Sequence, residues 1–237
     1  GCLNHLSNRE GNVSEEVRRK QDKMRIFEFL KWVNNYTKEG KMNLLYSAFI
    51  REDSESKGYL KKVVSQCSIF KREFENVYLY ISRKDEAVLY KVEKNGLQEI
   101  DTFKYNKLSV FNEKSRIKKI RGFLRYNSFL RYLNEIINAY KIDIVYIRNS
   151  PSTKKMMSIV KNKRLIKLLE YPTYPYEKEY KHIHSKLELI LFWNNKPKKI
   201  EEFVDLVVGI SAEKNLKVGK KFILINNGIQ VDSVKVK

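Results

Sequence analysis

The chain has 237 residues, of which 42% are apolar and 12% aromatic, and this composition excludes both a long disordered chain and a collagen-like one. The formal net charge of +20 predicts an anionic partner: nucleic acid, an anionic membrane face or a phosphorylated substrate. Two cysteines, Cys2 and Cys67, provide neither a disulfide framework nor the ligand spacing of a zinc site.

The first 41 residues differ in pattern from the rest of the chain. Ser14 is a candidate helix cap, Val17, Met24, Phe27 and Leu30 follow at roughly helical spacing, and Gly40 is a natural stop. We therefore expect a charged amphipathic helix with a loose leader over residues 1–41. A domain covering residues 42–237 is expected to follow.

From Met42 onward, short apolar runs alternate with segments of helical spacing. The expected strands cover residues 43–48, 77–81, 87–90, 97–100, 143–147, 165–169, 204–208 and 222–225. The strands at 87–90 and 97–100 are expected to form a hairpin with its turn at Asn95 and Gly96. The expected helices cover residues 60–74, residues 117–140 as one long helix, a segment after Pro151 that carries Met156, Met157 and Val160, and residues 183–192. The apolar stripe of the long helix is interrupted at Asn127. The alternation predicts an α/β fold with a doubly wound, mostly parallel sheet.

Ligands of such sheets bind beyond the carboxyl ends of the strands, which directs attention to the loops that follow them. One of these loops ends in Ser56, Lys57 and Gly58 at the start of a predicted helix, where free backbone N–H groups favour phosphate or sugar hydroxyls. The sequence contains no phosphate-binding fingerprint. Ser54 or Ser56 can equally be an ordinary helix cap.

The segment 170–179 combines Glu170, at the end of a predicted strand, with three tyrosines and two prolines. Tyrosine rings beside hydroxyl and carboxylate groups suit carbohydrate recognition. They can equally pack the loop against the sheet, and the residues alone leave both interpretations open.

The remaining reactive side chains predict no metal site. His182 and His184 lie two residues apart, which places them on nearly opposite sides of a predicted helix. Cys67 lies within an apolar helical pattern and is expected to be a buried structural thiol. The apolar runs fall far short of the roughly 20 residues that span a bilayer, and no secretion signal is visible, so we expect a cytoplasmic protein.

The positive charge is concentrated in the middle of the chain, with six cations on residues 114–125 alone. A solvated helix face accounts for such a run, and so does a cationic surface that lies on an anionic membrane. Nucleic-acid binding is a third interpretation, but no recognition motif supports it.

Three passages of the sequence resemble a known family. They are residues 44–64, residues 143–148 followed by the run LLEYPTYPYE at 168–177, and residues 204–211 followed by the run FILINNGIQV at 222–231. In this order they resemble the N-terminal domain of family 4 glycosyltransferases of the GT-B fold, particularly bacterial capsule and exopolysaccharide enzymes. The resemblance implies a Rossmann-like domain that forms the acceptor-side half of a GT-B enzyme.

The resemblance also implies an activity and its partners. A sugar would pass from a nucleotide-sugar donor to a hydroxyl of a saccharide or lipid-linked acceptor, without a metal, at the inner face of the cell membrane. The donor-binding domain of the family, with two glutamates eight residues apart, would begin after Lys237. We therefore expect this chain to bind no cofactor by itself and to be inactive alone.

The resemblance assigns roles to particular residues. Glu170 would polarise the acceptor hydroxyl, although many relatives carry a histidine there, and Asn227 and Gly228 would serve the hinge between the two domains. The expected acceptor-binding residues are Glu52, Ser56, Lys57, Gly58, Arg148, Thr173, Tyr174 and Tyr176. The alternative from another class is a basic, non-catalytic binding module for nucleic acid or an anionic membrane surface.

Overall fold

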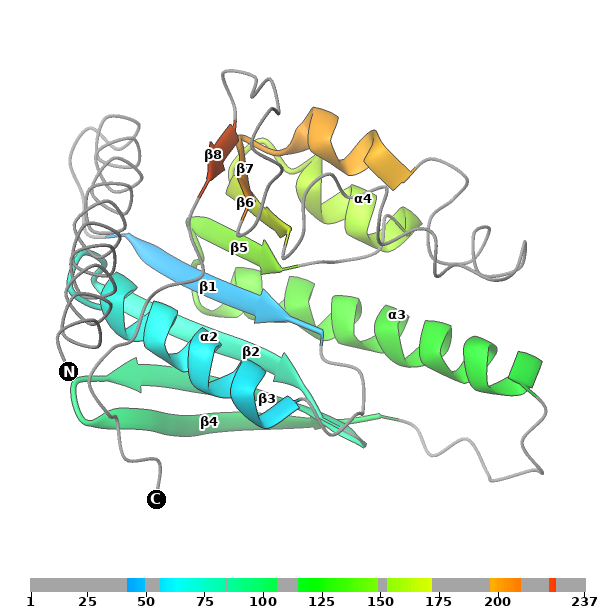
Figure 1. The fold of residues 1–237 in the computed structure, drawn as a ribbon, viewed down its shortest axis with the longest axis horizontal. Helices are drawn as coiled ribbons and strands as arrows, with labels where there is room; N and C mark the ends of the chain where they lie inside the picture. Colours follow the sequence, from blue (N-terminus) through cyan, green and yellow to red (C-terminus); the bar gives the residue numbers. More distant parts are fainter. Residues whose placement is uncertain are drawn as a thin grey trace, which may run out of the picture.

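The computed structural model describes residues 42–49, 56–83, 85–105, 115–148, 153–171, 197–209 and 222–224. The helical extension expected over residues 1–41 and the helix expected over 183–192 lie outside these ranges, so both stay predictions. Two helices, α2 (Ser56–Phe70) and α3 (Ser115–Ala139), dominate the described part together with one central sheet (Figure 1). The shorter elements α4 (Lys154–Val160) and the 3-10 helix η1 (Pro197–Phe203) complete the helices.

The sheet has eight strands in the order β4-β3-β2-β1-β5-β6-β7-β8. Their bounds are β1 (Asn43–Ala48), β2 (Asn76–Ser82), β3 (Glu86–Glu93), β4 (Gly96–Lys104), β5 (Ile144–Arg148), β6 (Ile166–Tyr171), β7 (Leu206–Gly209) and β8 (Phe222–Leu224). All pairings from β2 through β1 to β8 are parallel, whereas β3 pairs antiparallel with both β2 and β4. The prediction of an α/β fold is confirmed, and the sheet is mixed.

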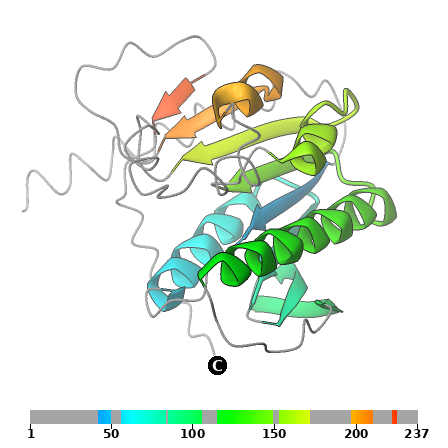
Figure 2. The ribbon, with the colours of Figure 1, turned by 90° about the vertical axis from the view of Figure 1, so that its right-hand side faces the viewer.

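Helices cover both faces of this sheet, with α2 on one side of β1 and α3 on the other (Figure 2). Successive side chains of a strand point to opposite faces of the sheet. Because both faces are covered, the residues of each central strand are apolar on both sides, and the sequence is a continuous apolar run. In β1, Leu44 and Tyr46 belong to the core beneath α2, whereas Leu45 belongs to the core beneath α3 and α4. Both sets are fully buried, as the sequence pattern predicted.

The helix α2 packs through Val63, Val64, Cys67 and Phe70, which recur at helical spacing and are all buried. The thiol of Cys67 is fully buried in this core, which confirms its expected placement. Phe74 lies beyond the end of α2 but still packs against the same face of the sheet.

The helix α3 is one long helix, as predicted, and it continues through Asn127. Its buried stripe differs from the predicted one: Tyr126, Phe129, Leu130, Leu133, Ile136 and Ile137 face the core. The earlier members of the predicted stripe, Ile120 and Leu124, are 45% and 42% exposed. Asparagine has only a weak helix penalty, which packing on both sides of it easily outweighs.

The hairpin of β3 and β4 forms the edge of the sheet. The two-residue turn Lys94–Asn95 joins the strands, and Gly96 follows with a φ of 140°, which a side chain would strain. The hairpin was expected with its turn at Asn95 and Gly96, one residue later. The difference is a shift of register at the tip and leaves the pairing of the strands intact.

The helix α4 begins where Thr153 caps it by accepting a hydrogen bond from the backbone N–H of Met156 at 3.3 Å. Its methionines Met156 and Met157 are buried, as the predicted helix required. The 3-10 helix η1 was not expected from the sequence. It contributes Ile200, and the following Val204, to the same core as α4.

Candidate functional site

The connections between parallel strands run in opposite directions along the sheet from one position at its carboxyl edge. From β1 the chain proceeds through α2 to β2 on one side, and from β5 it proceeds through α4 to β6 on the other. Strands β1 and β5 are adjacent, so the connections diverge between them. Ligands of open α/β sheets bind at such a point, beyond the carboxyl ends of the strands.

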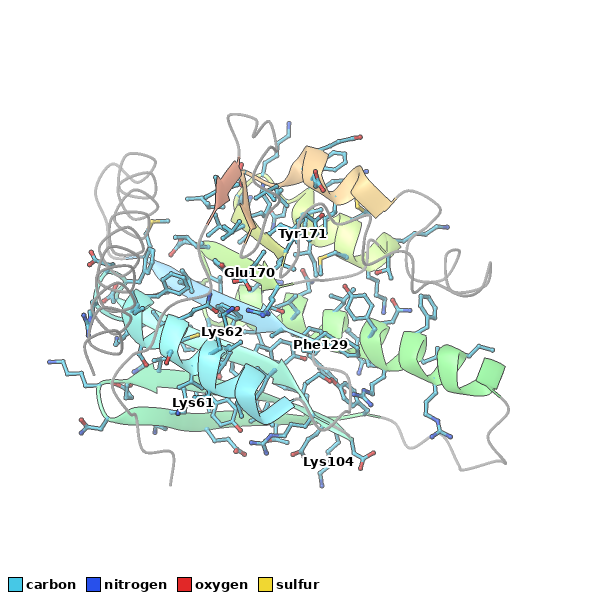
Figure 3. All side chains as sticks on the ribbon, viewed as in Figure 1. Lys61, Lys62, Lys104, Phe129, Glu170 and Tyr171 are labelled. Carbon is cyan, nitrogen blue, oxygen red and sulfur yellow. The ribbon has the colours of Figure 1, made fainter. Side chains whose placement is uncertain are left out.

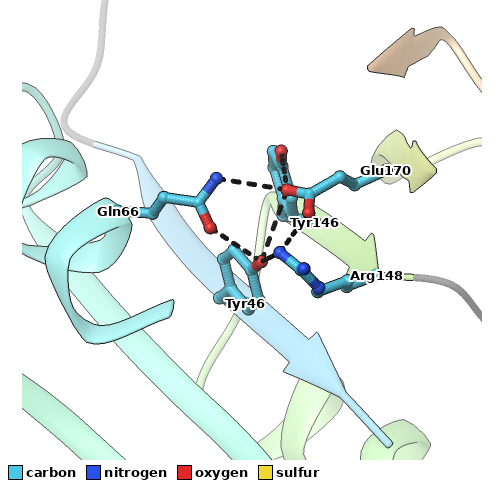
Figure 4. Close-up of polar contacts among 5 residues, drawn as sticks. All are labelled: Tyr46, Gln66, Tyr146, Arg148 and Glu170. Carbon is cyan, nitrogen blue, oxygen red and sulfur yellow. Dashed lines mark hydrogen bonds and ion pairs between the residues drawn. The ribbon is translucent and has the colours of Figure 1, made fainter. Parts of the chain in front are cut away.

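Four polar side chains from three neighbouring strands converge on the α2 face at this end. The strand register places Tyr46 of β1 opposite Tyr146 of β5, and Arg148 of β5 opposite Glu170 of β6. Because side chains alternate between the faces with a period of two, all four lie on one face of the sheet. The helix α2 adds Gln66 from above (Figure 4).

The carboxylate of Glu170 is the hub of this cluster. Its Oε1 accepts a hydrogen bond from Nη1 of Arg148, which also forms an ion pair with it. Its Oε2 accepts from the hydroxyl of Tyr146 at 2.5 Å and from Nε2 of Gln66 at 3.3 Å. The hydroxyl of Tyr46 lies 3.1 Å from Oε1 of Gln66 and 3.4 Å from Oε2 of Glu170.

The cluster is removed from solvent. Glu170 is completely buried and Arg148 is 5% exposed. Removing two charges from water costs several kcal/mol for each ion unless good geometry and further hydrogen bonds compensate. Here the opposite charges touch, and neutral donors occupy the second oxygen of the carboxylate. The arrangement therefore fixes Arg148 and Glu170 in one geometry.

Aromatic stacking supports the two tyrosines. The rings of Tyr46 and Tyr146 stack at a centroid distance of 4.7 Å and an interplanar angle of 17°, and Phe70 of α2 lies 5.5 Å from Tyr146. Burial, and next the negative charge of Glu170, raise the pKa of Tyr146 well above its ordinary value. Tyr146 therefore stays a neutral donor to the carboxylate at physiological pH.

A further cation lies next to the cluster. Lys62 of α2 is half-buried one turn before Gln66, close enough that the charges of both Arg148 and Glu170 act on it (Figure 3). Burial, and next the charge of Arg148, lower the pKa of Lys62, whereas the charge of Glu170 opposes that shift. Among the described residues of the cluster, two cations therefore lie near one carboxylate.

The structure brings together two of the residues that the sequence singled out, Arg148 and Glu170. Glu170 does not begin a loop as expected: β6 continues through it to Tyr171, and its carboxylate is enclosed. Ser56, Lys57 and Gly58 form the first turn of α2, at the carboxyl end of β1. The other expected site residues lie outside the described ranges: Glu52, Thr173, Tyr174, Tyr176, Asn227 and Gly228.

Sequence reasoning missed Tyr46, Lys62, Gln66 and Tyr146. A signal for the tyrosines was present, because each lies two residues before the last residue of a parallel strand and therefore shares a face with that residue. No comparable signal marks Lys62 and Gln66. Their contact with the cluster depends on the rotation of α2 about its axis.

The described part of the chain contains no group of three or more His, Cys, Asp or Glu side chains that could hold a metal ion. Within the same residues, no helix has the length and apolarity needed to cross a membrane.

Comparisons with known proteins were made at the level of family, sequence and structure. No family model, no curated protein and no solved structure matches this chain. Inferences about its function therefore depend on the residues and the geometry described above.

Proposed function

We propose that this chain is the acceptor-side domain of a glycosyltransferase that uses a nucleotide-sugar donor. One observation carries the proposal: a buried Arg148–Glu170 pair from adjacent parallel strands lies at the carboxyl edge, next to the divergence of β1 and β5. Buried charges at such a position are more costly than an apolar core, so a role beyond packing is favoured.

The strand order also supports the proposal. The strands β2-β1-β5-β6-β7 are parallel neighbours in the order that a Rossmann fold has around its crevice, which the nucleotide-sugar enzymes would share. Beyond β2 the sheet departs from that fold, because β3 and β4 continue it as an antiparallel hairpin. The departure affects the edge of the sheet, three strands away from β5.

The charge of the cluster suits the expected ligands. Among the described side chains of the cluster, Lys62 and Arg148 are cations and Glu170 is a carboxylate, and cations at a site favour the phosphate of a sugar nucleotide or of a lipid-linked acceptor. In this proposal Arg148 pairs with an acceptor phosphate. Glu170 holds Arg148 in place and reaches the acceptor hydroxyl only by exchanging one of its present hydrogen-bond donors for it.

The test uses the complete protein encoded by the gene, in which we expect a donor-binding domain with a Glu-x7-Glu pair after Lys237. The protein is incubated with radiolabelled nucleotide sugars and a lipid extract, and the label transferred to the organic phase is counted. Glu170→Gln and Arg148→Met should each reduce transfer by about 100-fold or more. Asp143→Asn, at the opposite end of β5, is the matched control and should leave transfer unchanged.

Two results would count against the proposal. One is an open reading frame without a second α/β domain. The other is transfer that survives both substitutions in the cluster.

A further inference from the structure

The strand β4 is a long, open edge of the sheet. It has nine residues, more than any other strand of the described sheet, and lies at one end of the strand order (Figure 1). Among the described residues, β4 pairs with β3 alone, and its residues 98–101 are exposed. The unpaired N–H and C=O groups of an edge strand can pair with another chain, so natural proteins keep such strands short or protect them. An edge of this length therefore needs another form of protection.

The pairing of β4 with β3 is interrupted at Ile100. Glu99 lies opposite Tyr90 and Asp101 lies opposite Leu89, so that two consecutive residues of β3 face three of β4. Ile100 is thus the extra residue of a β-bulge, and it is 38% exposed. A bulge bends the strand and increases its local twist. A second regular strand therefore cannot follow β4 on both sides of Ile100.

One backbone donor of this open edge is already occupied. Tyr105 donates its N–H to the carbonyl of Asp85, and the direction of the N–H groups alternates along an antiparallel strand. The N–H of Phe103 therefore points toward β3, and the N–H of Thr102 points away from it. The carboxylate of Asp101 accepts a hydrogen bond from this outward N–H at 2.8 Å. A strand added at this edge would have to displace Asp101 before its carbonyl could bond to Thr102.

The same side chains bring negative charge to the edge. Glu99 and Asp101 are exposed, and Glu99 accepts a hydrogen bond from the hydroxyl of Thr102 at 2.9 Å. Residues 85–105 contain five acidic residues and three lysines, although the whole chain has a net charge of +20. If two copies paired antiparallel about Ile100, Glu99 of each copy would lie opposite Asp101 of the other. Like charges directly opposite each other destabilise a pair of strands.

We propose that β4 is a blocked edge: Glu99, the bulge at Ile100 and the contact of Asp101 with Thr102 prevent a second copy of this chain from extending the sheet. The proposal does not depend on sugar transfer. Docking of a partner's strand fits less well, because the bulge and the occupied N–H oppose regular pairing with a strand of any sequence.

The test measures self-association of the full 237-residue chain by sedimentation velocity, in about 0.15 M salt, which screens the long-range repulsion between basic chains. Glu99→Thr/Asp101→Thr removes both carboxylates and frees the N–H of Thr102, and should strengthen association by about tenfold. Deletion of Ile100 in the same chain should strengthen association again. The deletion restores regular pairing, because residues 99 and 101 lie opposite Tyr90 and Leu89, which belong to the cores on opposite faces of the sheet.

A proline at position 102 shows whether the association uses this edge. Because β3 does not use the N–H of Thr102, proline can replace this residue without breaking the pairing of β3 with β4. Thr102→Pro added to Glu99→Thr/Asp101→Thr should return the chain to a monomer with an unchanged circular dichroism spectrum. The matched control, Glu86→Thr/Glu93→Thr, removes two carboxylates from the inner strand β3 and should sediment as the parent chain does.

Three outcomes would overturn this proposal. The first is a chain that stays monomeric when both carboxylates and Ile100 are removed. The second is association of the β3 control as strong as that of Glu99→Thr/Asp101→Thr. The third is a parent chain that already associates and that Thr102→Pro alone converts to a monomer, because β4 would then be a docking strand.

Discussion

At the amino end of the parallel strands, polar side chains bind mostly backbone groups, whereas in the Glu170 cluster at the carboxyl end they bind one another. Asp143 accepts a hydrogen bond from the backbone N–H of Asn43 at 2.8 Å, and Asp205 accepts from the N–H of Lys167 at 2.8 Å. The side-chain amide of Asn43 donates to the carbonyls of Tyr140 and Lys141. These residues satisfy backbone groups that the end of a sheet leaves without partners.

The cluster at the carboxyl end is bonded differently. The hydrogen bonds described above for Glu170, Arg148, Tyr46, Tyr146 and Gln66 each join two side chains. Bonds between side chains form a small fraction of the hydrogen bonds in proteins, and buried networks of them are costly unless complete. The comparison indicates that the amino end serves the fold, while the carboxyl end carries a feature that the fold does not require.

The largest expected effect comes from removing one charge of the buried pair. Glu170→Ala leaves Arg148 buried without its counter-ion and should lower the free energy of unfolding by about 3–5 kcal/mol. Chemical denaturation measures this loss. The double variant Glu170→Leu/Arg148→Met should recover more than half of it, and Glu135→Ala at the solvated Arg131–Glu135 pair on α3 should cost no more than about 0.5 kcal/mol. A loss below about 1 kcal/mol for Glu170→Ala would mean that the pair is not desolvated.

The next prediction compares the loss of one buried tyrosine hydroxyl on each face of the sheet. Tyr146→Phe removes a hydrogen bond to a buried carboxylate and should cost about 2 kcal/mol of unfolding free energy. Tyr80→Phe removes an equally buried hydroxyl that donates to the carbonyl of Phe129 at 3.1 Å, and should cost about 1 kcal/mol. Denaturant titrations measure both losses of unfolding free energy. If they are equal, the hydrogen bond to the charged Glu170 contributes no more than the neutral bond of Tyr80.

A third prediction concerns the amino end. Asp143→Ala deprives the N–H of Asn43 of its acceptor in a partly buried position, at a cost of about 1.5 kcal/mol. Asp143→Asn keeps an acceptor oxygen and should recover most of this cost. Thermal unfolding of the two variants measures the difference. Neither variant should alter ligand binding, and a loss of binding in Asp143→Asn would contradict the division between the two ends.

The smallest expected effect is a dependence on pH. Because burial and Arg148 lower the pKa of Lys62, the unfolded chain binds more protons than the folded one between that lowered pKa and the ordinary lysine pKa of about 10.4. Stability therefore rises with pH across that alkaline range, and the cost of charging Lys62 is fully present below it. Lys62→Met should be more stable at neutral pH, by less than about 1 kcal/mol, and should lack this rise.

The neighbouring Lys61 provides the control for this measurement, because its side chain is exposed. Lys61→Met should keep the pH profile of the parent chain. A profile that is also unchanged in Lys62→Met would show that the charge of Lys62 is not coupled to the cluster.

The sequence predicted the strands well, because their apolar runs depend only on local pattern. The first strand was expected at Asn43–Ala48 and has those bounds. The helix α3 shows where local pattern fails. Ile120 and Leu124 are apolar but exposed, because they lie on a different side of the helix from the buried Tyr126, Phe129 and Leu133. Periodicity identifies a helix face, whereas burial depends on what lies opposite it.

The candidate site was predictable in part. The rule on carboxyl ends selected Arg148 and Glu170, which the structure joins. It could not reveal that Glu170 is enclosed, because β6 continues to Tyr171 and α2 supplies Gln66 from a position a hundred residues earlier in the chain. Tertiary packing determines such contacts, and a single sequence carries no local record of them.

The position of β1 also has a consequence for how the protein is made. This strand is the first in the described chain, yet it lies at the centre of the sheet, between β2 and β5. Asn43 of β1 bonds to Asn76 of β2, which lies 33 residues later in the chain. It also bonds to Asp143, directly before β5, which lies 100 residues later. One edge of β1 therefore stays open during synthesis until β5 has left the ribosome, and such an edge can pair with another nascent chain. Closing this distant pairing is slow compared with forming the β2–β3–β4 meander, so the centre of the sheet is completed after its edge.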